Sequence, residues 1–264
     1  NFNIPIIGRV DPQFDNTTGK SLIELFGSDF GPNPSVQVSG SSCTINNQSH
    51  VYIQFTSPAG FGAINDIVVI SGDATSNKKN FGYYPPEIFR PQMSYANTGG
   101  PEQTIAIYGA NFAGGISGSN LQIRLNGVLC FTRIVSHDAV TFVVPEGFGQ
   151  NLAVNVTVGG QISNSVMFSY YPPSISFVTG GAVRSTSGGN TFAIHGDSFD
   201  TLGSVTVGGA TATCLQSSWN HTLIECQAPA GSGEDNEVIV ITQDNRVSSP
   251  AYYSYSAPLV TQMT

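Results

Sequence analysis

The stretch LFGSDF at residues 25–30 is the first of three related hexapeptides that decide how this chain folds. The other two are IYGANF at residues 107–112 and IHGDSF at residues 194–199. Each copy combines an aliphatic residue that can end a strand, a glycine that permits a turn, small polar residues, and a phenylalanine that we expect to return to the core. Three copies in the same order indicate an internal repeat.

Two further landmarks recur with the hexapeptide and mark the start and the end of each repeat. A proline followed two residues later by an aliphatic residue opens each one: Pro5/Ile7, Pro86/Ile88, Pro173/Ile175 and again Pro258/Val260. Alternating aromatic residues close each one: Phe81/Tyr83, Phe168/Tyr170 and Tyr253/Tyr255. Short runs of alternating apolar residues lie between these landmarks, and no segment has helical periodicity. We therefore expect an all-β chain of three tandem immunoglobulin-like β-sandwiches, each approaching about 100 residues.

The joints between the repeats are short and rich in proline. The sequence YYPP stands at residues 83–86 and again at residues 170–173. Proline fixes φ and restricts the residue before it, so these joints predict a stiff rod rather than a flexible string. The expected domains are 1–84, 85–171 and 172–256, and 257–264 is expected to be the stub of a following segment.

Composition narrows the classes of function. Charged residues make up only 10% of the chain, against about 25% in an ordinary soluble domain. The net charge is −8, and no basic stripe is present that could neutralise nucleic-acid phosphates or anionic lipid. No run of about 20 apolar residues is present, so we expect membrane attachment only through a segment outside this chain.

The repeats resemble a known family. The Pro-x-aliphatic opener, the hexapeptide, a Val-x-Val-x-Gly strand, the cysteines and the Pro-x-Gly turns at Pro58, Pro145 and Pro229 resemble IPT/TIG domains. These are immunoglobulin-like folds of plexins, related receptors and some transcription factors. The acidic chain lacks the basic loops of the transcription-factor branch, so the resemblance points to the extracellular branch. Tandem domains with sequons are similar to surface TIG-repeat proteins, among them adhesion and allorecognition proteins of social amoebae.

The resemblance also implies a disulfide between Cys214 and Cys226, which would join two neighbouring strands. Counting three residues back from the proline of each Pro-x-Gly turn gives Cys226 in the third repeat, but Phe55 in the first and Phe142 in the second. Cys43 and Cys130 are then left single. Each is either a small buried hydrophobic residue or the source of an intermolecular disulfide.

Potential glycosylation sites support an extracellular location. The four N-x-S/T sequons begin at Asn16, Asn47, Asn155 and Asn220. Together with a disulfide and low charge they favour a secreted or cell-surface glycoprotein that carries N-linked glycans. Glycans at Asn47 and Asn220 would cover one end of the first and third repeats and leave the same end of the second repeat bare.

The second repeat also carries an insertion after its hexapeptide. This glycine-rich loop is either a neutral surface insertion or a contact for a partner, since loops on a rigid sandwich are common binding elements. The candidate partner loop consists of Gly114, Gly115, Ile116, Ser117 and Gly118.

No catalytic signature is present. The sequence contains no H-E-x-x-H motif, nucleophile elbow or P-loop, and its four histidines are scattered over the repeats. We expect no catalysis, no metal site and no cofactor. Three functions stay open. The chain is the extracellular part of an adhesion or recognition glycoprotein that binds a cell-surface protein, homophilically or heterophilically, through sandwich edges and loops. Otherwise it is a structural spacer or filament component, or the accessory domains of a secreted carbohydrate-active enzyme.

Overall fold

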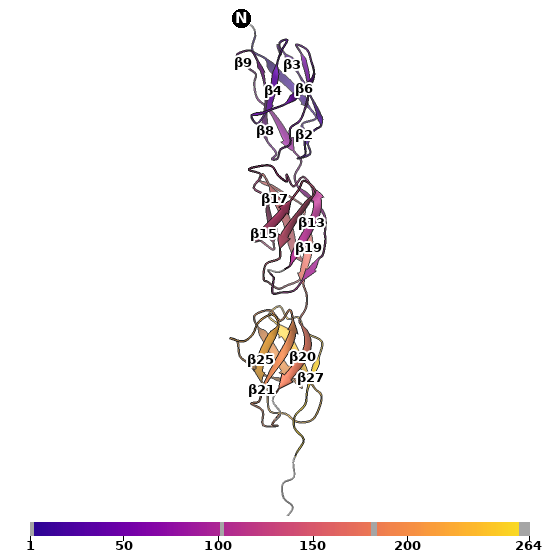
Figure 1. Cartoon of the computed structure of the whole chain (residues 1–264), viewed down its shortest axis with the longest axis vertical. Helices are drawn as coiled ribbons and strands as arrows, with labels where there is room; N and C mark the ends of the chain where they lie inside the picture. Colours follow the sequence, from indigo (N-terminus) through magenta and orange to yellow (C-terminus); the bar gives the residue numbers. More distant parts are fainter. Residues whose placement is uncertain (1–2, 101–102, 181–183, 259–264) are drawn as a thin grey trace, which may run out of the picture. The chain divides into compact units, whose positions relative to one another are not determined.

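The computed structural model describes residues 3–100, 103–180 and 184–258, and every regular element in this part of the chain is a β-strand. The strands form three successive sandwiches, which Figure 1 shows in indigo to purple, magenta to red, and orange to yellow. The all-β fold of three immunoglobulin-like sandwiches is therefore confirmed. The expected stub at 259–264 lies outside the described residues, and no helix among those described is long and apolar enough to cross a membrane.

The first sandwich contains ten strands in two sheets. One sheet has the order β1-β3-β7-β6, and the other has the order β2-β10-β8-β4-β5 with β9 paired to β8. The strands are β1 (Ile6–Asp11), β2 (Phe14–Asp15), β3 (Leu22–Ser28), β4 (Ser35–Val38), β5 (Ser41–Ser42), β6 (Thr44–Gln48), β7 (Tyr52–Thr56), β8 (Asn65–Ser71), β9 (Ala74–Thr75) and β10 (Lys79–Tyr83). Alternate residues such as Ile23 and Leu25 on β3 are fully buried, because successive side chains of a strand point to opposite faces.

The second sandwich repeats this plan with nine strands. The strand order is β11-β13-β16-β15-β14-β17-β19-β12, with β18 paired to β17. The strands are β11 (Glu87–Pro91), β12 (Tyr95–Ala96), β13 (Thr104–Ala110), β14 (Gln122–Leu125), β15 (Val128–Val135), β16 (Ala139–Val143), β17 (Leu152–Val158), β18 (Gln161–Ile162) and β19 (Val166–Tyr170). One continuous strand, β15, joins what are separate sheets in the other two sandwiches, because its first half pairs with β14 and its second half with β16.

The third sandwich has two four-stranded sheets, β20-β21-β25-β24 and β23-β22-β26-β27. Its strands are β20 (Ser174–Gly180), β21 (Thr191–Asp197), β22 (Gly203–Val207), β23 (Ala210–Thr211), β24 (Thr213–Cys214), β25 (Leu223–Gln227), β26 (Asn236–Thr242) and β27 (Ala251–Tyr253). Its core contains Phe192, Ile194, Val238 and Val240, together with the chain's one tryptophan, Trp219.

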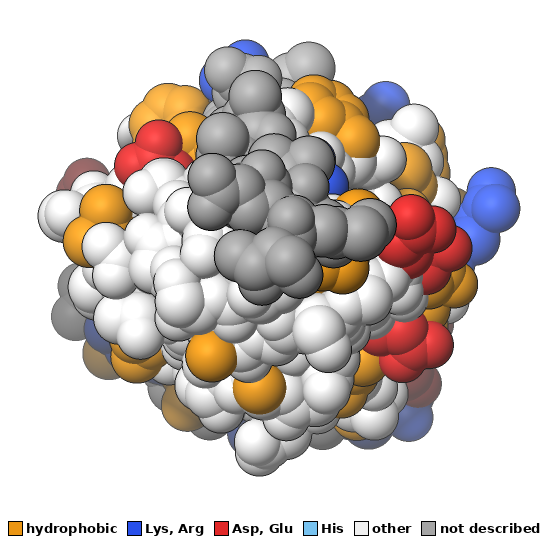
Figure 2. All heavy atoms as spheres, turned by 90° about the horizontal axis from the view of Figure 1, so that it is seen from below, with side chains coloured by type: hydrophobic (Ala, Val, Ile, Leu, Met, Phe, Trp, Pro, Cys, Tyr) orange, Lys and Arg blue, Asp and Glu red, His pale blue; other side chains and the backbone are white. Residues whose placement is uncertain are grey.

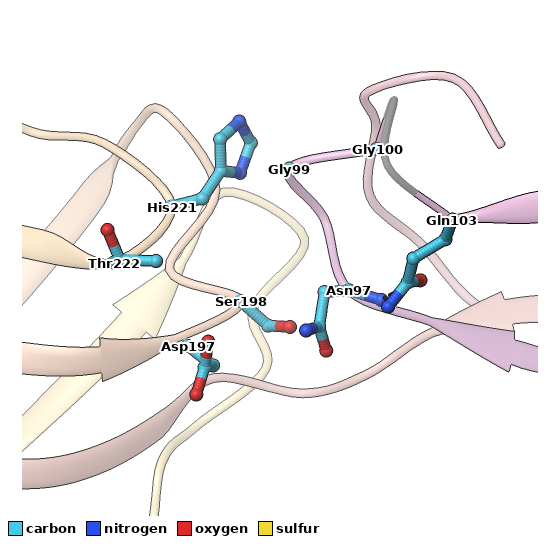
Figure 3. A pocket seen from close by; sticks show the side chains of 8 residues that line it. All are labelled: Asn97, Gly99, Gly100, Gln103, Asp197, Ser198, His221 and Thr222. Atoms are coloured by element: carbon cyan, nitrogen blue, oxygen red, sulfur yellow. Dashed lines mark hydrogen bonds between the residues drawn. The ribbon is translucent and has the colours of Figure 1, made fainter. Parts of the chain in front are cut away.

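The structure explains each position of the hexapeptide. A Cβ on Gly27 would collide with the carbonyl oxygen of Ile6 and would stand 2.6 Å from the Phe30 ring, so only glycine fits there. The phenylalanine itself is fully buried in all three copies. The residue before it has positive φ: 60° at Asp29, 62° at Asn111 and 60° at Ser198. Small polar side chains tolerate this left-handed conformation best, which accounts for the Asp, Asn and Ser. Figure 3 shows the turn that contains Ser198.

Compactness divides the chain differently from the sequence repeats, since the division passes through the second sandwich. The first compact unit comprises Asn1–Met93, Thr104–Val143 and Ala153–Met167, and the second comprises Ser94–Gln103, Val144–Leu152 and Phe168–Thr264. The domain boundaries expected at the paired prolines stay a prediction.

Little charge is exposed on the surface. Figure 2 shows one face, on which uncharged side chains predominate and acidic and basic groups are few. This agrees with the low content of charged residues in the sequence.

Candidate binding surface

Strand β15 lies between β14 and β16 in the sheet order of the second sandwich, and each of these partners covers a different part of it. Residues 128–130 pair only with β14, and residues 131–135 pair only with β16. Each half of the strand therefore has a hydrogen-bonded neighbour on one side, within the part of the chain that the structure describes. With eight residues, β15 is also the longest strand described.

Three large apolar side chains of this edge face solvent. Val128 is 54% exposed, Leu129 55% and Phe131 71%, while Cys130 between them is 5% exposed and points into the core. We call Val128, Leu129 and Phe131 the apolar strip. Scattered single apolar residues are normal on a protein surface, but Leu129 and Phe131 stand two residues apart on one face of the strand, and Val128 lies next to them on the other face.

The equivalent edges of the other sandwiches carry no such patch. Register fixes the equivalence. Leu129 lies opposite Arg124, just as Ser42 lies opposite Gln37 and Thr211 lies opposite Thr206. The strip positions are exposed in all three sandwiches. They are occupied by Ser41, Ser42 and Thr44 in the first sandwich and by Ala210, Thr211 and Thr213 in the third.

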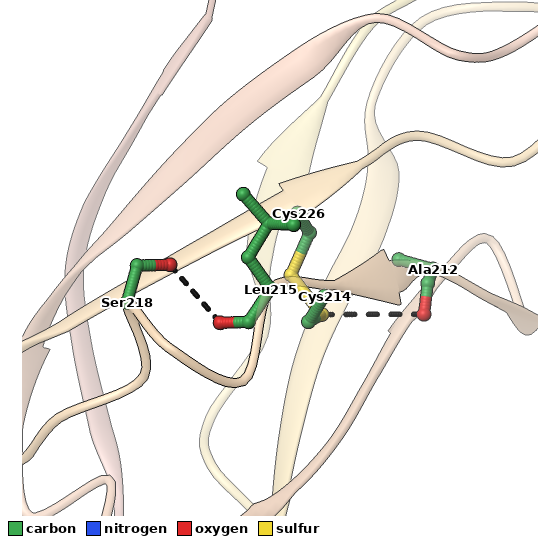
Figure 4. The surroundings of a disulfide bond; sticks show 5 residues. All are labelled: Ala212, Cys214, Leu215, Ser218 and Cys226. Atoms are coloured by element: carbon green, nitrogen blue, oxygen red, sulfur yellow. Dashed lines mark hydrogen bonds between the residues drawn. A yellow bond between two sulfur atoms is a disulfide. The ribbon is translucent and has the colours of Figure 1, made fainter.

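The first and third sandwiches also protect this edge in other ways. In the first, β6 has a register shift between Ile45 and Asn47, and Asn47 is an exposed sequon residue. In the third, β24 has only two residues and is tied to β25 by a disulfide between Cys214 and Cys226 (Figure 4). Bulges and short strands are usual devices against edge-to-edge pairing. Strand β15 has its own register shift, but only after Thr132, so the strip lies on an unbroken stretch.

The single cysteines do not occupy the position of Cys214. Cys43 and Cys130 are equivalent to Ala212, and the position of Cys214 is filled by Ile45 and Thr132. Burial raises the pKa of the Cys43 thiol to about 11 and raises that of Cys130 as well. Both thiols are therefore protonated and unreactive at neutral pH, which favours the reading of small buried hydrophobic residues.

Comparison with known proteins identifies the repeats. The family model for the IPT/TIG domain matches three times, at residues 5–83, 89–170 and 173–255, which is nearly the whole chain. The chain belongs to the IPT/TIG domain family. We call its domains TIG1, TIG2 and TIG3. No curated protein matches it significantly.

Solved structures show the fold at low sequence identity. A crystal structure described as a complex with a xylogluco-oligosaccharide is 13% identical with a TM-score of 0.51; the match covers 96% of this chain and 60% of that one. The surface glycan-binding protein PbSGBP-B from Prevotella bryantii is 12% identical with a TM-score of 0.46, over 72% of this chain and 57% of that one. The extracellular region of plexin A4 is 16% identical with a TM-score of 0.36, over 92% and 24% respectively. The chain thus spans less than two thirds of each of these proteins.

The sequons occupy different surroundings. Asn16, Asn47 and Asn220 are exposed in loops or on an edge strand, and the Asn220 side chain accepts hydrogen bonds from the Thr222 and Leu223 amides. Asn155 is half-buried on β17 of TIG2, between the buried Val154 and Val156.

Asn155 shares a sheet face with Leu129 of the apolar strip. It lies opposite Arg124 on β14, and Arg124 lies opposite Leu129 on β15. Directly opposite residues of antiparallel strands point to the same face, and strands are spaced by about 4.8 Å. A glycan on Asn155 would therefore start about 10 Å from the strip.

The insertion of TIG2 packs within the first compact unit. The Gly159 amide donates a hydrogen bond to the Ser119 carbonyl at 2.7 Å. Phe61 of TIG1 lies beside the loop, since a Cβ on Gly118 would stand 3.8 Å from its ring. Ile116 is half-buried, whereas Gly115, Ser117 and Gly118 are exposed. The partner role of the loop Gly114–Gly118 stays a prediction, and contact with TIG1 is a further role for it.

A threonine–histidine hydrogen bond recurs in both compact units. Thr17 Oγ1 lies 2.9 Å from His137 Nδ1 in the first unit, and Thr98 Oγ1 lies 2.7 Å from His221 Nδ1 in the second. Both threonines are almost completely buried. Sequence reasoning missed these histidines, although a signal was present: His50, His137 and His221 each stand eight residues before the proline of a Pro-x-Gly turn.

The second of these pairs borders a hollow of about 340 Å³ (Figure 3). It is lined by Asn97, Gly99, Gly100, Gln103, Asp197, Ser198, His221 and Thr222. His221 Nε2 lies 3.1 Å from a Glu146 carboxylate oxygen, at ion-pair distance but outside hydrogen-bond geometry. If the Thr98 hydroxyl donates its hydrogen bond to Nδ1, the neutral imidazole carries its proton on Nε2. That N–H then faces the Glu146 carboxylate. Among the described residues, no group of three or more His, Cys, Asp or Glu is placed to hold a metal ion.

Proposed function

We propose that this chain is a recognition segment of an extracellular or cell-surface protein, which binds a protein partner through the β15 edge of TIG2 and catalyses no reaction. The observation that carries the proposal is the difference between equivalent edges. TIG2 exposes Val128, Leu129 and Phe131, where the other two domains expose small, mostly polar residues. Burying such side chains in a partner contributes about 1.5–3 kcal/mol for each one fully covered.

The acidic, charge-poor composition and the exposed sequons support an extracellular setting, as does the disulfide of TIG3. Adhesion between cells fits a small apolar contact of this kind, because many weak contacts between two surfaces act together.

Carbohydrate recognition is a second candidate, favoured by two aromatic pairs. Phe14 and Tyr84 stack with ring centroids 5.9 Å apart, and Tyr95 and Tyr171 stack at 5.6 Å. All four rings are between 42% and 50% exposed. Exposed aromatic faces offer apolar area with a polar rim, which suits the apolar face of a sugar ring.

A strip exchange tests the function. The variant V128S/L129S/F131T places the TIG1 residues on the TIG2 edge, so it uses side chains that a domain of this family already carries there. Beads coated with the intact, oxidised chain are mixed with cells and with one another, and attachment is counted. We expect attachment by the wild type and loss of most of it in the exchange variant.

The matched control is F89T/M167S, which removes two other apolar side chains of TIG2, 62% and 57% exposed, that lie on β11 and β19. It should attach like the wild type. Equal attachment by the exchange variant would contradict the strip as the binding surface. Attachment abolished instead by Y84A/Y171A and by added oligosaccharide would favour the second candidate.

A further inference from the structure

A hollow of about 550 Å³ lies beside Asn16 within the first compact unit. Its wall includes Tyr84 and Ile162, whose side chains are 48% and 64% exposed. The exposed Glu87 and the buried Asn111 add polar groups to the same wall. A concave, partly apolar surface with a few polar groups is the usual form of a small-molecule site, and this volume falls within the roughly 300–1,000 Å³ of such sites.

The Asn16 side chain is free to carry a modification beside this hollow. Asn16, Thr17 and Thr18 form an N-x-T sequon, and Asn16 is exposed. Its backbone amide donates to Asp15 Oδ1 at 2.7 Å, and its carbonyl accepts the Gly19 amide at 2.9 Å. Its side-chain amide has no hydrogen-bond partner in the part of the chain that the structure describes, so a sugar attached there would break no such bond.

An aromatic pair stands next to this asparagine. Phe14, two residues before Asn16, is 42% exposed and stacks on Tyr84 with ring centroids 5.9 Å apart. Alternate residues of an extended chain point the same way, and Asp15 between them is buried, so Phe14 and Asn16 both face solvent. Exposed ring faces offer apolar area that the apolar face of a sugar ring can cover. A sugar on Asn16 would therefore start beside a surface that suits it.

We propose that Asn16 carries an N-linked glycan and that its first N-acetylglucosamine packs into this hollow, against the Phe14–Tyr84 pair. In the attachment step, the Asn16 amide nitrogen loses a proton and bonds to the anomeric carbon of the sugar, whose bond to a lipid-diphosphate donor breaks. The acetyl methyl group suits the apolar wall at Ile162, and the Glu87 carboxylate can accept hydrogen bonds from the sugar hydroxyls. The inference goes beyond the proposed function and rests only on its extracellular setting.

Only the Asn16 sequon has these surroundings. None of the other three sequons, at Asn47, Asn155 and Asn220, has an aromatic residue two positions earlier. Asn97 of TIG2 stands in the place of Asn16, because the residue before each lies opposite the last residue of the strand that closes its domain. A stacked aromatic pair recurs there, but the sequence after Asn97 is Thr-Gly, so no sequon is formed. TIG1 alone combines the pair with an acceptor asparagine.

Glycan occupancy and thermal stability test this inference. The variant N47Q/N155Q/N220Q keeps Asn16 as its one sequon. Made in a glycosylating host, it should carry a glycan at Asn16 by mass spectrometry. Enzymatic trimming to a single N-acetylglucosamine should leave the midpoint temperature of TIG1 unfolding unchanged, whereas the same variant from a host that adds no glycans should unfold about 2–4 °C lower. The matched control N16Q/N47Q/N155Q, which keeps Asn220 instead, should unfold at the same temperature with and without its glycan.

Substitutions in the aromatic pair locate the contact. Phe14→Ala and Tyr84→Ala should each remove most of the gain in midpoint temperature that the glycan gives. Comparing the glycosylated and unglycosylated forms of one variant cancels that variant's own effect on stability. Phe131→Ala, which removes another exposed ring of the same compact unit, should keep the gain.

Three results would overturn the inference: an unoccupied Asn16, equal midpoint temperatures with and without the sugar, or a gain that survives both Phe14→Ala and Tyr84→Ala. Attachment to cells through the apolar strip is measured separately. If that attachment persists when the glycan result is negative, the proposed function is retained.

Discussion

The hydroxyl of Thr98 lies 2.7 Å from Nδ1 of His221, and it also accepts a hydrogen bond from the Asp200 amide at 3.4 Å. Thr17 and His137 form the equivalent bond, with the Thr17 amide donating to Asn111 Oδ1 at 3.1 Å. One threonine thus satisfies several polar groups that burial has removed from water. Such a connection is costly to break, because its partners are left unpaired.

Replacing Thr98 with valine should destabilise the second compact unit by about 1–3 kcal/mol, since the shape is kept while the Asp200 amide and His221 Nδ1 lose a partner. Denaturant unfolding of the intact chain measures the change. The control is Thr186→Val at the equivalent position of TIG3, where the side chain is exposed and the loss should be negligible. Equal effects at both positions would contradict a role for the Thr98–His221 bond.

Opening the TIG3 disulfide should cost about 3 kcal/mol, because the bridge closes a loop with a sequence separation of 12 residues. TIG1 and TIG2 hold Phe55 and Phe142, which are almost completely buried, at the position of Cys226 and do not depend on a bridge. In calorimetry, C214A/C226A should therefore have a lower midpoint temperature for the unfolding transition of TIG3 alone. A uniform shift of all transitions would show that the bridge acts beyond its own domain.

Alkaline pH should weaken TIG1 through Cys43. Burial raises the pKa of this thiol from 9.0 to about 11, so the unfolded chain loses the proton first. The stabilising contribution is complete below pH 9 and is lost as the pH rises through 11. Denaturant midpoints between these values should fall more steeply for the wild type than for Cys43→Ala. In a Cys130→Ala background, the rate of Cys43 alkylation should rise with the raised pKa of about 11, because the thiolate is the form that reacts. A rate that reaches half its maximum near pH 9 would contradict this raised pKa.

A glycan at Asn155 should weaken contacts at the apolar strip, because Asn155, Arg124 and Leu129 share one sheet face. Chain produced in a glycosylating host should therefore attach less than Asn155→Gln from the same host. Asn220→Gln removes a sequon from TIG3 instead and is the matched control, for which no gain is expected. A gain with Asn220→Gln of the same size would show a general effect of glycan mass, and no gain with either would separate Asn155 from the strip.

Much of the fold is readable from the sequence because the determining residues are local. The hexapeptide requires a glycine where a side chain would collide with a neighbouring strand, and a phenylalanine that returns to the core. LFGSDF, IYGANF and IHGDSF therefore predict three equivalent sandwiches before any long-range contact is known. The joining of Cys214 to Cys226 follows from the family resemblance for the same reason. The stiff rod expected from the paired prolines stays a prediction that small-angle scattering can check.

Sequence reasoning predicted binding through sandwich edges and loops but did not single out the apolar strip, for a physical reason. Val128, Leu129 and Phe131 flank Cys130, and a run of apolar residues with no polar alternation is equally compatible with a strand buried on both faces. Only the structure shows that Cys130 is buried while Val128, Leu129 and Phe131 are exposed. The places of the single cysteines could not be read in the same way, because counting back from the Pro-x-Gly turn locates β7, β16 and β25 but not the strand that precedes each of them.

Thr186 repeats the place of Thr17 and Thr98 in the chain, and its carbonyl accepts the Gly231 amide just as theirs accept Gly60 and Gly147. It differs in being exposed, with its hydroxyl free of the histidine contact found at the two buried positions. The same hydrogen bond thus recurs between a threonine of one domain and a histidine of the next, and that histidine stands eight residues before the proline of a Pro-x-Gly turn. Domains that keep this threonine and this histidine can be added, removed or reordered without the need for a different contact, so gene duplication can change the number of domains easily.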